Sequence, residues 1–68
     1  MDEEALQQSI RKFLRTVGVR SQQEIEKAVA QARADGRIGD ADSFPATMTL
    51  DVAGLKLHVS FDGEIRLA

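Results

Sequence analysis

The sequence lacks several residue types on which small proteins often rely. Its 68 residues include no cysteine, tryptophan or tyrosine and a single proline. Without cysteine the chain forms neither a disulfide nor a thiolate metal site, which are common sources of stability in chains of this length. No apolar run approaches the roughly 20 residues that span a bilayer. Residues 1–4 are acidic and lack the basic and apolar regions of a signal peptide, so we expect a cytoplasmic protein.

The charge of the chain is close to balanced and gives no indication of a charged partner. Nine basic and eleven acidic residues leave a formal net charge of -2, which provides no overall attraction to nucleic acid or to an anionic membrane. Asp40 and Asp42 lack the further oxygen ligands and the spacing of a calcium loop. We therefore expect no metal site and no cofactor.

The last third of the sequence alternates apolar and polar residues, which is typical of strands with one buried face. A two-residue turn at Ala53 and Gly54 would pair Leu50 with Leu57. A second turn over residues 61–63, with Gly63 left-handed in a bulge, would return the chain. A type I′ turn at residues 62–63 is the alternative, but it would place Ile65 on the polar face. The pattern predicts strands at about 47–52, 55–60 and 64–67, whose apolar residues are Met48, Leu50, Val52, Leu55, Leu57, Val59, Ile65 and Leu67.

The first half of the sequence predicts two helices, at about residues 3–17 and 22–35, separated by a turn. Asp2 is a suitable N-cap for the first helix, and Gly18 is placed to end it. Ser21 and Glu24 match a capping box that would begin the second helix, and Gly36 would end that one. The apolar residues lie at helical spacing, and they are Leu6, Ile10, Phe13, Leu14 and Val17, then Ile25, Ala28, Val29 and Ala32.

Together these elements predict an α+β fold in one domain that spans residues 1–68. A two-helix hairpin would cover one face of a three-stranded antiparallel β-meander. Residues 37–46 would form the one irregular connection.

Several segments of the chain resemble a known family. They are the runs SIRKFL at residues 9–14, VGV at 17–19, SQ at 21–22 and EIEKAV at 24–29, with PA at 45–46, MTL at 48–50 and GEI at 63–65. This pattern is similar to a family of short bacterial proteins classed only as a domain of unknown function. The resemblance implies a free-standing small bacterial protein and brings no activity, substrate or catalytic residue with it.

The polar face of the predicted central strand carries the residue types of a catalytic triad, His58, Ser60 and Asp62. Side chains two residues apart on a strand are about 6.6 Å apart. A nucleophile and its base require roughly 2.6–3.2 Å. We therefore interpret these residues as part of a solvated face and expect no enzyme activity.

The predicted helix pair also suggests a DNA-binding helix-turn-helix, in which Gly18 forms the turn. The second helix would carry Glu24 and Glu26 toward the phosphates, which weakens that hypothesis. A basic group in the first half of the chain could bind an acidic partner or RNA, although no tyrosine or tryptophan is present to stack bases. This basic group consists of Arg11, Lys12, Arg15 and Arg20.

The sequence favours a non-enzymatic protein-interaction or self-associating module, with the basic group as the candidate partner-binding residues. A nucleic-acid-binding accessory protein of the helix-turn-helix type is the alternative. Whether the partner is another protein or a second copy in a homodimer stays open, while nucleic acid and membrane are disfavoured.

Overall fold

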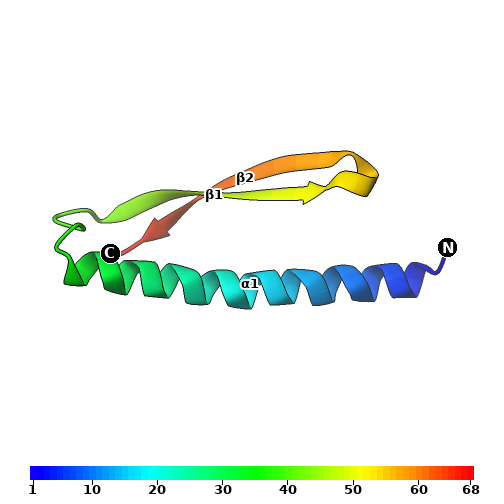
Figure 1. Cartoon of the computed structure of the whole chain (residues 1–68), viewed down its shortest axis with the longest axis horizontal. Coiled ribbons are helices and arrows are strands. Elements are labelled where there is room, and N and C mark those ends of the chain that lie inside the picture. Colours follow the sequence, from blue (N-terminus) through cyan, green and yellow to red (C-terminus); the bar gives the residue numbers. More distant parts are fainter. The chain divides into compact units, whose positions relative to one another are not determined.

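The computed structural model describes residues 1–68 and contains one long helix and one β-hairpin (Figure 1). The elements are α1 (Glu3–Ala34), β1 (Ser43–Val52), the short 3-10 helix η1 (Ala53–Leu55) and β2 (Leu57–Arg66). The chain divides into two compact units, Met1–Ile38 and Gly39–Ala68. The fold is α+β, as predicted. The predicted two-helix hairpin and three-stranded meander are wrong.

The N-terminus of α1 is capped as predicted. Asp2 has extended backbone angles, and its Oδ1 accepts a hydrogen bond from the backbone N–H of Ala5 at 3.0 Å. Glu3 and Glu4 lie in the first turn, where their negative charge interacts favourably with the helix dipole.

Gly18 does not end the helix, because α1 continues through residues 18–22 without a break. An interior glycine costs only about 1 kcal/mol relative to alanine. A turn at this point would remove several backbone hydrogen bonds and would require a second helix to nucleate separately. Ser21 is therefore an interior helical residue. The predicted turn and the predicted capping box are both wrong.

The helix ends at the second predicted position. Gly36 has a φ of 70°, and its N–H donates to the carbonyl of Arg33 at 3.1 Å, while the N–H of Arg37 donates to Ala32 at 2.9 Å. These two bonds form a Schellman motif. Gly39 follows soon after with a φ of 57°, so the segment after Gly36 does not resume the helix.

The Gly18→Ala variant tests the continuous helix. A Cβ at residue 18 would meet nothing within 4 Å, so we expect the free energy of unfolding to rise by about 0.5–1 kcal/mol. Gly36→Ala is the matched control. It should lower stability by about 1–2 kcal/mol, because alanine is strained in the left-handed region. Urea unfolding followed by circular dichroism measures both, and a destabilising Gly18→Ala would indicate a turn at residue 18.

The hairpin register differs from the predicted one by two residues. Leu50 pairs with Val59, and Val52 pairs with Leu57. The turn contains residues 53–56, with Lys56 left-handed at a φ of 53°. A two-residue turn would need a glycine at its first position or positive φ at both positions, and Ala53 meets neither condition. Because the shift is an even number of residues, the apolar side chains of the two strands still share one face. Leu55 and Leu67 were predicted on that face, but Leu55 lies in η1 and Leu67 follows the end of β2.

The second predicted turn lies inside β2. Asp62 pairs with Thr47, and Gly63 pairs with Ala46. Strand β1 begins at Ser43, so β2 finds partners where a turn was predicted and no third strand forms. Pro45 is compatible with β1 because a two-stranded sheet leaves one edge of each strand unpaired.

Neither unit has a hydrophobic core. No residue of the chain is buried, and the exposed large apolar side chains include Phe13 at 54% and Phe61 at 58%. A surface of this kind is unusual for a soluble monomer, which keeps contiguous apolar patches small.

Candidate interaction surfaces

An apolar stripe extends along almost the whole of α1. Because the helix is continuous, the residues predicted for two separate helices lie on one face. At about 100° per residue, they fall within roughly 160° around the axis. We name as the seam eight positions that lie within roughly 120° on this face and follow one another at intervals of three or four residues. They are Leu6, Ile10, Phe13, Val17, Ser21, Ile25, Ala28 and Ala32.

The seam is exposed at its large residues. Leu6, Ile10, Phe13 and Ile25 are all exposed, with Ile10 at 42%. Val17, Ser21 and Ala32 are half-buried. The large seam residues can therefore contact another molecule.

The hairpin carries a second apolar face. The register places five residues of β1 and five of β2 on that side. Sequence reasoning missed Phe44 and Phe61, which were assigned to a loop and to a turn. Each extends the alternation of apolar and polar residues in its strand by one further step of two residues. That alternation could have placed both residues on the apolar face. The face consists of Phe44, Ala46, Met48, Leu50, Val52, Leu57, Val59, Phe61, Gly63 and Ile65.

The opposite face of the hairpin is polar, and its side chains pair across the two strands. His58 Nδ1 lies 3.6 Å from Asp51 Oδ2. The hydroxyls of Ser60 and Thr49 are 3.0 Å apart. The hydroxyl of Thr47 donates to Asp62 at 3.0 Å. His58, Ser60 and Asp62 thus each contact a residue of β1, and these cross-strand pairs help to fix the register. The His58 side chain is 71% exposed, as expected from its position on the polar face.

All four members of the basic group lie exposed on α1. Arg11, Lys12 and Arg15 share one flank of the helix, whereas Arg20 lies about 140° around the axis from Arg15. None of the four forms an ion pair within the chain. The helix-turn-helix hypothesis is wrong in its geometry, because α1 contains no turn.

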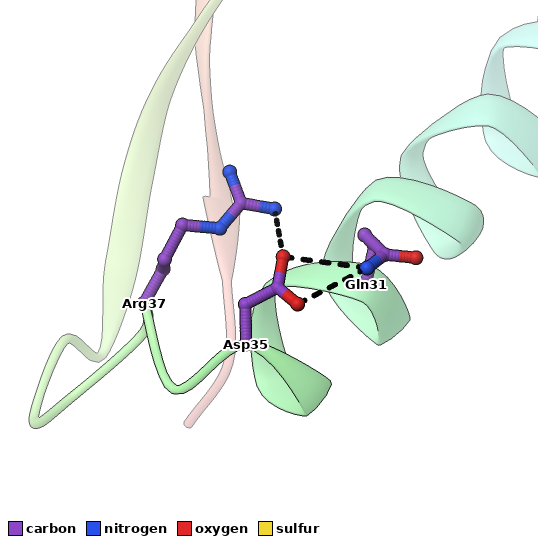
Figure 2. Close-up of polar contacts among 3 residues, drawn as sticks. All are labelled: Gln31, Asp35 and Arg37. Carbon is purple, nitrogen blue, oxygen red and sulfur yellow. Dashed lines mark hydrogen bonds and ion pairs between the residues drawn. The ribbon is translucent and has the colours of Figure 1, made fainter.

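A small polar cluster lies at the C-terminal end of α1 (Figure 2). Gln31 Nε2 donates to both carboxylate oxygens of Asp35 at 3.2 and 3.3 Å. Arg37 Nη2 lies 3.0 Å from Asp35 Oδ2. These contacts add to the backbone bonds that close the helix. The chain contains no group of three or more histidine, cysteine, aspartate or glutamate residues placed to hold a metal ion.

No helix of the structure combines the length and the apolar character that crossing a membrane requires.

Comparison with known proteins identifies a family without an assigned role. No curated protein and no solved structure matches the chain. One family model covers residues 1–68, and its description is "Family of unknown function (DUF6494)". This match confirms the resemblance to a family of unknown function. The chain belongs to the family of unknown function DUF6494.

Proposed function

We propose that the protein is a non-enzymatic interaction module that self-associates through its apolar faces. The observation that carries the proposal is the absence of a buried side chain in either unit. In proteins, most of the stability of a helix comes from packing of its apolar face. A two-stranded hairpin alone is marginally stable in water. Both units therefore gain stability when their apolar faces are covered.

The surface properties of the chain support protein as the partner. The helix and the hairpin both present large apolar side chains, including Phe13, Ile25 and Phe61. Extended exposed apolar surface is typical of protein–protein contacts. The outer edges of β1 and β2 are also unpaired, and open strand edges favour pairing with another chain. A net charge of -2 adds little repulsion between two copies.

The concentration dependence of unfolding tests this proposal. If folding is coupled to association, the urea midpoint rises with protein concentration by mass action. We expect a clear increase in the midpoint between about 2 and 200 μM chain, followed by circular dichroism. A midpoint that stays constant over this range, with a cooperative transition, would contradict self-association.

A further inference from the structure

We propose that two copies of α1 pair antiparallel along the seam, about a two-fold axis that crosses the seam at the level of residue 19. This inference rests on the proposed self-association and specifies its geometry. The occupant of the seam is a second copy of this chain.

The spacing of the seam residues has two-fold symmetry. From Leu6 to Ala32, successive seam positions are separated by four, three, four, four, four, three and four residues. This order is the same in both directions. In an antiparallel pair, every seam position therefore faces another seam position. The residue numbers of two facing positions add up to 38. The mean spacing, 26 residues over seven intervals, is about 3.7 and close to the 3.6 of an α-helix, so the helices can stay nearly straight.

The sizes of the seam residues favour the antiparallel orientation. The N-terminal half of the seam is large and the C-terminal half is mostly small. Antiparallel pairing places Leu6 against Ala32 of the second copy, and Ile10 against Ala28. Large residues then face small ones at both ends, which allows an even distance between the helix axes. Parallel pairing would place large against large at one end and small against small at the other.

Length also supports a second α1 as the occupant. A helix of 32 residues is about 48 Å long. A strand of ten residues is about 33 Å long. The element that matches α1 in length is the α1 of another copy, and a shared two-fold axis is the commonest way in which identical chains pair.

Spin-label distances test the orientation directly. The chain has no cysteine, so Gln8→Cys and Val19→Cys each provide a single labelling site. Both residues lie on the side of α1 opposite the seam, and Val19 is 52% exposed. In the antiparallel pair, the two Val19→Cys labels lie at the same level of the dimer. The two Gln8→Cys labels are offset along the axis by 22 residues, or about 33 Å.

We expect the label-to-label distance in Gln8→Cys to exceed that in Val19→Cys by about 15 Å or more. Equal short distances would establish a parallel pair and overturn the orientation, while self-association would stand. A dimeric mass with no short distance in Val19→Cys would place the helices apart and would also overturn the inference. No dipolar coupling in either variant, together with a monomeric mass, would overturn both the inference and the proposed function.

Discussion

Replacing Ile10 with aspartate is expected to weaken self-association by a factor of about 10³ or more. Ile10 is 42% exposed in the single chain and lies within the seam. Two-fold symmetry would bring two such carboxylates into each dimer interface. An unpaired polar or charged group in an apolar interface costs about 2 kcal/mol or more. Two of them thus amount to about 4 kcal/mol, and each 1.4 kcal/mol is a tenfold change in affinity.

Gln8→Asp is the control for this variant. It introduces the same side chain two residues away, but on the face of α1 opposite the seam. We expect less than a threefold change in the dissociation constant measured by sedimentation equilibrium, in keeping with a surface substitution. Similar losses for Ile10→Asp and Gln8→Asp would indicate that the seam has no role in association and that aspartate acts only by lowering helix propensity.

The second large effect is expected on the hairpin, where Val59→Asp should lower the free energy of unfolding by about 3 kcal/mol. Val59 is half-buried and pairs with Leu50 at the middle of the apolar face. If that face is covered in the associated state, a carboxylate there loses its hydration without gaining a partner. Urea unfolding at a fixed protein concentration measures the loss.

The neighbouring residue gives a matched control, because successive residues of a strand point to opposite faces. Ser60→Asp adds the same charge on the polar face, where the Thr49 hydroxyl lies 3.0 Å from Ser60 and can donate to a carboxylate. We expect a change within about 1 kcal/mol. His58→Gln, on the same polar face, should change stability by about 0.5 kcal/mol or less. Equal losses in Val59→Asp and Ser60→Asp would show that the apolar face stays in water.

Local patterns predicted the ends of the helix and the faces of the strands. Asp2 and Gly36 were predicted as caps and act as caps, since nothing in the flanking sequence competes with them. The alternation of apolar residues in the last third gave the correct face for Leu50 and Val59, because the period of two persists when the register shifts by two.

The errors arose where a local motif fits two different structures. Gly18 and Ser21 match the end of one helix and the beginning of another, yet an interior glycine costs only about 1 kcal/mol, less than a break in the backbone hydrogen bonds. Gly63 was predicted to form a bulge because the pairing of β2 with residues 43–46 was not foreseen. Both errors came from local motifs whose outcome depends on what the neighbouring residues can pair with.

The seam could not be recognised from the sequence, because α1 was predicted as two separate helices. Ser21 was assigned to a cap, and that assignment separates the apolar residues before Gly18 from those that begin at Ile25. Only a continuous α1 places Ser21 between Val17 and Ile25 on one face. The symmetric spacing of the seam therefore follows from the structure, although every residue in it was already assigned to an apolar or capping role.

The molecular mass of the unmodified protein in solution tests the central claim most directly. Sedimentation equilibrium between about 1 and 100 μM should give a weight-average mass that rises toward twice the chain mass of 7.5 kDa as concentration increases. A folded species that stays at 7.5 kDa over the whole range would contradict the account, because its exposed apolar faces would then have no second copy to cover them.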